Sequence, residues 1–248
     1  MYYYLAIWIH YWATEKPDIR KIYPIEMEGM SMKYEYILFD MDGTLTESGT
    51  GIINSVVYAL EKYGIEVKDR SKLSKFVGPP LWDSFERYYG FSEAEARKAV
   101  EYYREYYRGK GMFENVLYEG VEALLQQLKE NNRTLLVATS KPEAFAKQIL
   151  EHFDIATYFS CVAGSDFDGS RVNKDEVIQR ALEIASVNDP SKAVMIGDRE
   201  HDILGAKKKG LDSIGVLYGY GDRHELEQAG ADYIAETVGE IGNILLKG

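Results

Sequence analysis

Short hydrophobic runs alternate with longer segments of helical period from Lys33 onward. Most of the runs are continuously apolar, which is typical of parallel strands covered by helices on both faces. The pattern predicts strands at 36–40, 134–140, 159–164, 193–198, 213–219 and 232–236. It predicts helices at 120–131, 142–152, 174–187, 200–209, 222–229 and 237–247. This alternation predicts an α/β fold with a doubly wound, Rossmann-like parallel sheet.

The interval 51–107 breaks this alternation, because only helical segments are recognisable in it. Ser92 and Glu95 form a capping-box pattern at the start of one of these helices. Glycines lie at both ends of the interval and suit flexible connections. We therefore expect a helical insert at 50–115, after the first strand. The α/β core would then comprise residues 32–49 and 116–248.

The first 31 residues have a different pattern. Residues 1–14 are uncharged and rich in aromatic side chains, but they fall short of the roughly 20 apolar residues that a spanning helix requires. No basic stretch precedes them, as one would in a signal peptide. Residues 15–31 carry two prolines and no clean period. We expect 1–31 to be an extension outside the core; an interfacial or partner-binding aromatic tail is the alternative.

Composition limits the classes of partner. The chain has 46% hydrophobic residues, enough for a packed core, and a net charge of −11. Such a surface repels phosphate backbones, so we expect no nucleic-acid partner, and any anionic substrate must be bound by a few local cations. We expect no membrane association. The single cysteine, Cys161, forms no intrachain disulfide, which fits a reducing, cytoplasmic compartment.

Polar side chains cluster where the predicted strands end, and ligands of open α/β sheets bind at these ends. Asp40 and Asp42 end the first strand, where residues i and i+2 share a face and address the same small volume. Gly43 then lets the chain turn away. Thr139 and Ser140 end the second strand just before a helix, which predicts a phosphate-binding turn.

Further acidic residues follow the fourth strand. Asp198 and Asp202 lie there, and Lys174 begins the helix that precedes this strand. If these carboxylates converge with those of the first strand, each ionised pair near 4 Å costs about 4 kcal/mol at an effective dielectric constant of 20. A set of oxygen ligands with so much negative charge suits Mg²⁺. With Mg²⁺ and Lys174 beside it, a carboxylate can attack phosphorus.

The order of these motifs resembles that of the haloacid dehalogenase-like superfamily. The matching segments are DMDGT at 40–44, Thr139 after its hydrophobic run, Lys174, and GDREHD at 197–202. The resemblance covers about 33–248, and the helical insert resembles that family's type 1 cap. Three further segments are similar to the phosphoglycolate phosphatase-type branch, namely FVGPPLWDSF (76–85), LYEGV (117–121) and VLYGYGDR (216–223).

The resemblance implies a role for each acidic residue. Asp40 would be the nucleophile that forms an aspartyl-phosphate. Asp42 would be the general acid/base, with its backbone carbonyl also binding the metal. The metal ligands would be Asp40, Asp42 and Asp198, and Asp202 would orient a metal-bound water or the lysine.

It also implies a phosphate-binding set. Thr139 and Lys174 would orient the phosphate during catalysis, and the residues that bind it would be Gly43, Thr139, Ser140 and Lys174. The lysine motif reads NKDEV at 173–177, without the prolines usual in this branch. Lys141 therefore stays open as a substitute for Lys174.

These observations predict a Mg²⁺-dependent cytoplasmic phosphatase for a small phosphorylated metabolite, as a monomer or homodimer. Phosphoglycolate is the leading substrate, and 5'-nucleotidase or pyrophosphatase specificity remains open. A phosphomutase would use the same aspartate but retain the phosphoryl group. A phospho-accepting signalling receiver explains neither the helical insert nor Asp42, and a hydrolytic dehalogenase would not need Asp42 or Mg²⁺.

Overall fold

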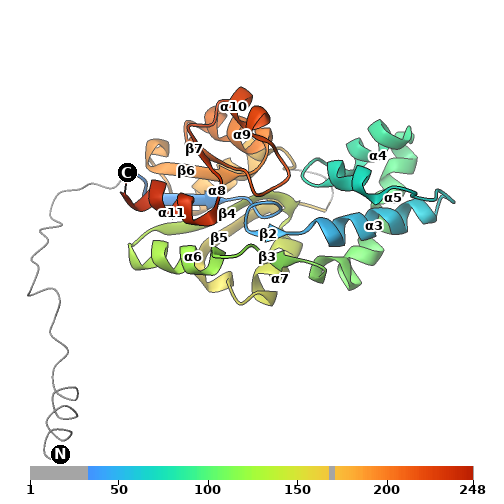
Figure 1. Cartoon of the computed structure of the whole chain (residues 1–248), viewed down its shortest axis with the longest axis horizontal. Helices are drawn as coiled ribbons and strands as arrows, with labels where there is room; N and C mark the ends of the chain where they lie inside the picture. Colours follow the sequence, from blue (N-terminus) through green and yellow to red (C-terminus); the bar gives the residue numbers. More distant parts are fainter. Residues whose placement is uncertain (1–32, 168–170, 248) are drawn as a thin grey trace, which may run out of the picture. The chain divides into compact units, whose positions relative to one another are not determined.

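A six-stranded sheet is the centre of the structure, a computed structural model that describes residues 33–167 and 171–247 (Figure 1). In sheet order its strands are β5 (Phe159–Ser165), β4 (Thr134–Pro142), β1 (Tyr36–Phe39), β6 (Ala193–Gly197), β7 (Asp212–Val216) and β8 (Tyr233–Ala235). Every neighbouring pair in this sheet is parallel. The predicted α/β fold class is confirmed.

Helices cover both faces of the sheet, which explains why its strands are mostly apolar. The helices are α6 (Val121–Glu130), α7 (Glu143–His152), α8 (Lys174–Ile184), α9 (Glu200–Lys209), α10 (Arg223–Ala229) and α11 (Val238–Lys247). Leu38 and Met195 belong to a buried cluster with side chains of α8. Phe39 and Ile196 belong to the cluster that contains buried residues of α6 and α7. Successive residues of a strand thus pack into the hydrophobic clusters on opposite faces of the sheet.

One predicted strand ends earlier than expected. Hydrophobic residues continue to 219, but β7 ends at Val216 and the following loop leaves the sheet. A Cβ atom on Gly219 would lie 2.4 Å from Cβ of Asp198, and one on Gly221 would lie 2.0 Å from the Asp198 backbone oxygen. Because this loop packs directly against Asp198, it needs glycines there and cannot continue the sheet.

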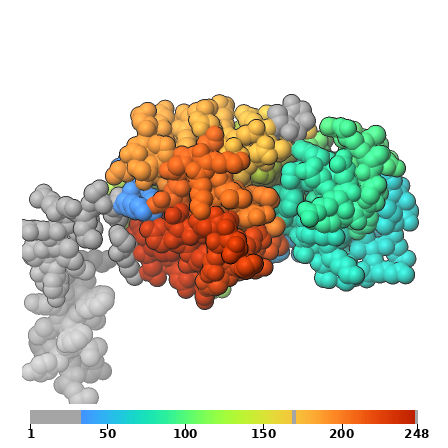
Figure 2. Space-filling view, turned by 90° about the horizontal axis from the view of Figure 1, so that it is seen from above, coloured from blue at the N-terminus to red at the C-terminus, as the bar shows by residue number. Residues whose placement is uncertain are grey.

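The interval without strands is helical, as predicted. It contains α3 (Gly49–Glu61), η1 (Arg70–Phe76), α4 (Leu81–Tyr89), α5 (Glu93–Gly109) and η2 (Gly111–Phe113). The capping box of α5 is confirmed, since Ser92 N donates to Glu95 Oε2 at 2.8 Å and Ser92 Oγ accepts from Glu95 N at 3.4 Å. These helices lie beside one edge of the α/β part (Figures 1 and 2). We call residues 49–113 the helical segment.

The connections to the helical segment are paired with each other. β2 (Thr46–Glu47) and β3 (Val116–Leu117) form a two-stranded antiparallel sheet. A Cβ atom on Gly51 would lie 1.8 Å from the backbone oxygen of Gly111. Glycine is therefore required at 51, because α3 and η2 approach each other closely next to these connections. Two-residue strands of this kind are too short to leave a pattern in the sequence.

Two further expectations concern the N-terminal extension and membrane-spanning helices. The extension predicted at 1–31 lies outside the described residues. Within 33–167 and 171–247, no helix combines the length and the apolar character needed to cross a bilayer.

Candidate active site

The sheet order brings three of the polar strand ends together. β1 lies between β4 and β6, so Asp40 after β1 has neighbours at the carboxyl ends of both adjacent strands. Thr139 lies near the end of β4, and Asp198 follows β6 directly. All three residues are buried. The long crossovers of the parallel sheet place these residues, which are distant in sequence, side by side.

An acidic cluster forms at this edge around one lysine. Asp40, Asp198 and Asp202 each offer a carboxylate oxygen within 4.8 Å of the others. Lys174 Nζ lies 2.8 Å from Asp40 Oδ1 and 2.8 Å from Asp202 Oδ1. It also donates to the Ala138 backbone oxygen at 3.3 Å. Two of the three buried carboxylates, Asp40 and Asp202, therefore share one buried ammonium group.

Burial and mutual repulsion disturb the titration of these groups. Burial raises the pKa of Asp40 to about 6; Lys174 opposes this shift, while Asp202 and Asp42 add to it. The pKa of Asp198 is raised well above its usual value by burial and by Asp202 and Asp40. Burial lowers the pKa of Lys174, but Asp202 and Asp40 outweigh it and the net shift is upward. The three carboxylates thus carry more negative charge than Lys174 neutralises.

The donor set fits a small divalent cation. Asp198 Oδ2 accepts the backbone N–H of Tyr220 at 2.7 Å. Its other oxygen, Oδ1, is buried and has no hydrogen-bond partner among the described residues. An unpartnered buried carboxylate oxygen carries a large free-energy cost, and a cation bound between Asp198 and Asp40 would remove it. Carboxylate oxygens are the ligands that hard cations prefer.

Asp202 has two structural tasks. Its Oδ2 accepts the backbone N–H of Arg199 at 3.1 Å, as part of the capping box that starts α9. Its Oδ1 forms the ion pair with Lys174. Its helix-start position fixes the carboxylate, which in turn holds the ammonium beside Asp40.

Gly43 allows the chain to turn directly over the cluster. It has a φ of +81°, and a Cβ atom added to it would lie 2.1 Å from Asp198 Oδ2. Its N–H donates to the backbone oxygen of Thr46 at 2.8 Å, which closes the turn. Glycine is therefore required both for the backbone conformation and for access to Asp198.

We expect Gly43→Ala to destabilise the fold by about 1–3 kcal/mol, because it combines left-handed strain with a clash against Asp198. Stabilisation by Mg²⁺ should also weaken as Asp198 is displaced. Thermal unfolding with and without Mg²⁺ measures both effects. Gly109→Ala is the matched control, since a Cβ there meets nothing within 4 Å. Equal stability of the two variants would contradict this interpretation of the turn.

Asp42 pairs with a different lysine from the one that contacts the three-carboxylate cluster. Its Oδ2 lies 2.9 Å from Lys141 Nζ, which also donates to the hydroxyl of Tyr107 at 2.5 Å. Lys141 and Tyr107 are buried, and Tyr107 belongs to α5 of the helical segment. The two lysines therefore have separate partners: Lys174 contacts Asp40 and Asp202, whereas Lys141 joins Asp42 to the helical segment.

Thr139 and Ser140 lie at an irregular end of β4, where its register with β5 shifts. Thr139 Oγ1 accepts the backbone N–H of Lys141 at 3.3 Å. The Ser140 backbone oxygen accepts a hydrogen bond from Ser165 Oγ at 2.8 Å. Both residues line the cavity that contains Asp40.

Sequence reasoning missed the contacts of Arg199. Its Nε lies 2.8 Å from Glu225 Oε1, and its Nη1 donates to the backbone oxygen of Val77 in the helical segment at 3.2 Å. Its position beside Asp198 in the GDREHD motif was the available signal. No pattern along the chain indicates its partners, because Val77 is 122 residues away.

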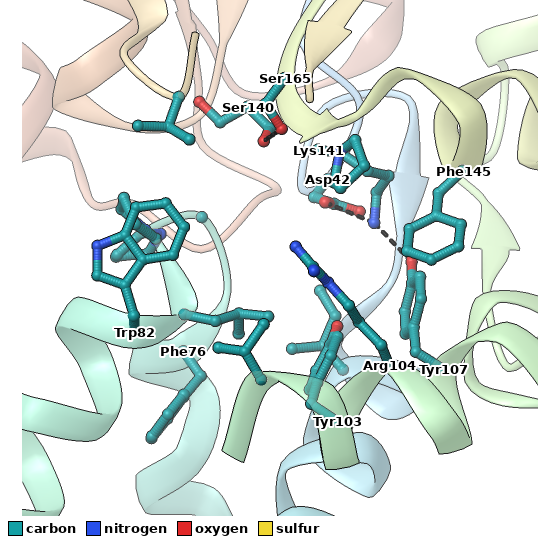
Figure 3. Close-up of a pocket in the computed structure, with 18 of the residues that line it drawn as sticks. Asp42, Phe76, Trp82, Tyr103, Arg104, Tyr107, Ser140, Lys141, Phe145 and Ser165 are labelled. Carbon is teal, nitrogen blue, oxygen red and sulfur yellow. Dashed lines mark hydrogen bonds and ion pairs between the residues drawn. The ribbon is translucent and has the colours of Figure 1, made fainter. Parts of the chain in front are cut away.

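Two cavities meet at Asp42. The first contains Asp40, Lys174 and Asp202 as well as Asp42. The second lies between Asp42 and the helical segment and is lined by aromatic residues, among them Trp82 (Figure 3). Lys141 and Pro80 border both. A substrate can therefore place one part in the acidic cavity and the rest in the aromatic one, with Asp42 at the junction.

Comparison with known proteins gives consistent results. The family model for haloacid dehalogenase-like hydrolases matches residues 37–216, more than half of the chain. A 5'-nucleotidase of Pseudomonas aeruginosa is 44% identical over 81% of this chain and 90% of its own length. The tyrosine-protein kinase PtkA of Mycobacterium bovis is 37% identical over 85% of this chain and 72% of its own length.

Solved structures are similar as well. The crystal structure of a predicted phosphatase from Clostridium acetobutylicum has a TM-score of 0.84 and 52% identity, over 87% of this chain and 99% of that one. The phosphatase names among the similar proteins agree with the enzyme class expected from the sequence. The family match, the two identities above 30% and the motif order lead to one conclusion: the chain belongs to the haloacid dehalogenase-like hydrolases.

Proposed function

We propose that the protein is a Mg²⁺-dependent phosphomonoester hydrolase that acts through an aspartyl-phosphate intermediate. The observation that supports this most is the buried cluster of Asp40, Asp198 and Asp202 around Lys174, with Asp42 at the entrance to a second cavity. Asp40, Asp198 and the backbone carbonyl of Asp42 would hold Mg²⁺. The ion would neutralise the phosphate and the carboxylates, so that the two anions can approach each other.

In the first half of the reaction, a carboxylate oxygen of Asp40 attacks phosphorus. The bond between phosphorus and the leaving oxygen breaks, and Asp42 gives its proton to that oxygen. Lys174 holds Asp40 by its 2.8 Å ion pair and shares the charge of the phosphoryl oxygens. Thr139, Ser140 and the backbone of Gly43 orient the phosphoryl group.

In the second half, water attacks the phosphorus of the aspartyl-phosphate. Asp42, now ionised, takes a proton from that water, and the acyl–phosphate bond breaks. Inorganic phosphate leaves and the Asp40 carboxylate is restored. Lys141 lies 2.9 Å from Asp42 and would hold this carboxylate in position through both proton transfers.

The helical segment would act as a cap, with 50–115 forming the cap domain and 32–49 and 116–248 the core. Two contacts support this role, the Lys141–Tyr107 hydrogen bond and the Arg199–Val77 hydrogen bond, because each joins a residue next to the site to the helical segment. Closure would exclude water during phosphoryl transfer, and opening would release phosphate.

We propose a small phosphorylated metabolite as substrate, with phosphoglycolate or a similar phosphoester leading. Phosphoglycolate phosphatase and pyrophosphatase are among the names of similar proteins. Specificity for a nucleoside monophosphate is the second candidate, favoured by the 5'-nucleotidase at 44% identity and by the aromatic lining of the second cavity. We further propose a cytoplasmic protein, monomeric or homodimeric, that binds neither nucleic acid nor membranes.

A phosphate-release assay over a panel of small phosphoesters, with Mg²⁺ and with EDTA, tests this function. We expect Mg²⁺-dependent release from p-nitrophenyl phosphate and faster release from at least one metabolite. Absence of Mg²⁺-dependent release from every phosphoester would contradict the proposal. A requirement for a bisphosphate activator, with phosphoryl retained in the product, would indicate a phosphomutase instead.

We expect Asp42→Asn to impair substrates with poor leaving groups most. An alkyl phosphate needs its leaving oxygen protonated and should lose about 10²–10⁴ in kcat/KM, whereas p-nitrophenyl phosphate, with a good leaving group, should lose much less in this step. The comparison is made under single-turnover conditions, so that only phosphoryl transfer to Asp40 is measured. Equal losses for both substrates would contradict the assignment of Asp42 as the acid.

A further inference from the structure

Arg104 lines the second cavity and forms no ion pair with a carboxylate of the described residues. The guanidinium donates to the backbone oxygen of Phe167 at 3.0 Å and lies 5.3 Å from the centre of the Phe167 ring. No carboxylate oxygen lies within 4.0 Å of it in the part of the chain that the structure describes. Burial and the nearby Arg108 lower the pKa of the Arg104 guanidinium, and Glu101 and Tyr103 oppose this shift only in part.

The other charged groups of this cavity are paired. Lys141 is neutralised by Asp42 at 2.9 Å. Asp166, which also lines the cavity, forms an ion pair with Arg171 at 2.6 Å. Each of these two pairs is neutral, so the charged side chains that line the cavity carry a net positive charge, which is that of Arg104.

Arg104 lies beside the space that the leaving group of a substrate would occupy. Figure 3 shows its side chain extending from α5 toward the strand ends that carry Asp42 and Lys141. Asp40 lines the acidic cavity but not this one. If phosphorus is held beside Asp40, then the substrate atoms beyond the leaving oxygen enter the space between Asp42 and Arg104.

We infer that Arg104 selects phosphoesters whose leaving group carries a second anionic group, a carboxylate or a phosphoryl group. This inference rests on the proposed function, because it assigns the aromatic cavity to the leaving group. A guanidinium forms charge-assisted, often bidentate hydrogen bonds with either anion. Since the site is partly desolvated, a leaving group without a negative charge would leave Arg104 unpaired there.

A matched pair of substrates tests the inference. Phosphoglycolate and 2-hydroxyethyl phosphate have the same phosphate and the same two carbons, but only the first has a carboxylate. We expect the wild-type protein to favour phosphoglycolate by about 10–100-fold in kcat/KM, the range of a charged hydrogen bond. In Arg104→Gln this ratio should fall to within about threefold of unity, while Arg104→Lys should keep part of it.

Arg108→Gln is the control variant. Arg108 is exposed, lies one turn further along α5, and also stacks near Phe167 at 5.2 Å. It should keep the wild-type ratio. Thermal unfolding of each variant checks that the fold is intact, and the lysine variant retains the test if the glutamine variant unfolds.

Three results would overturn the inference. They are a wild-type ratio near unity, an equal loss for both substrates in Arg104→Gln, and a preference for nucleoside monophosphates that depends on Trp82 rather than on Arg104. Hydrolysis of p-nitrophenyl phosphate distinguishes any of these three results from failure of the proposed function. If Mg²⁺-dependent release from that substrate persists, the phosphatase assignment stands and only the assignment of Arg104 is wrong.

Discussion

Asp40→Asn should reduce phosphoester hydrolysis by at least about 10⁴-fold, because the amide cannot serve as the nucleophile. The substitution keeps the shape of the side chain and removes one of three clustered carboxylates. Folding should therefore survive, since repulsion of about 3–4 kcal/mol per ionised pair at 4.8 Å is relieved while one contact with Lys174 is weakened. Initial rates with saturating Mg²⁺ measure the loss.

Asp154→Asn is the matched control for this variant. Asp154 is exposed and has a φ of +57°, a conformation that asparagine adopts readily. The Asp154→Asn substitution removes one negative charge, as Asp40→Asn does, but at a position distant from the site. It should leave the rate unchanged. A rate for Asp40→Asn within tenfold of the control would show that another group attacks the phosphate.

Removal of divalent cations should abolish hydrolysis and destabilise the protein. Without an ion, the ion pairs of Lys174 reach Asp40 and Asp202 but not Asp198, and Asp198 Oδ1 has no hydrogen-bond partner among the described residues. We expect EDTA to lower activity by more than about 10³-fold and excess Mg²⁺ to restore it. At a Mg²⁺ concentration of 100 Kd, linkage predicts about 2.7 kcal/mol of added stability.

The stability measurement distinguishes a local site from a general salt effect. Asp198→Asn should lose most of the Mg²⁺-dependent rise in Tm, whereas the exposed Asp154→Asn should keep it. The same Tm shift in both variants, or full activity in EDTA, would contradict a metal site at these carboxylates.

Most of the sheet was predictable because its strands are buried on both faces. β1 and β6 are almost entirely buried, so their sequences contain uninterrupted apolar residues and their ends coincide with the first polar ones. The helices were predictable from their period and caps, as in α5 with Ser92 and Glu95. The end of β7 was not, because residues 217–219 are compatible with a strand and only packing against Asp198 excludes it.

Part of the site was predictable for a topological reason. Ligands gather at the carboxyl ends of parallel strands, so Asp40, Thr139 and Asp198 were expected near one another. The partners of long cationic side chains were not predictable. Lys141 contacts a tyrosine 34 residues away, and Arg104 on an amphipathic helix has the pattern of a solvated residue. The packing of α5 against the strand ends brings Tyr107 to Lys141 and places Arg104 in the cavity that Asp42 also lines.

The identity of the nucleophile is tested most directly by trapping it. The protein is mixed with substrate and Mg²⁺, quenched in acid during turnover, treated with borohydride, and mapped by peptide mass spectrometry. Borohydride reduces an aspartyl-phosphate to homoserine, so the account predicts homoserine at position 40 only in samples that received substrate. Homoserine at another aspartate, or complete turnover without any reducible intermediate at position 40, would contradict the account.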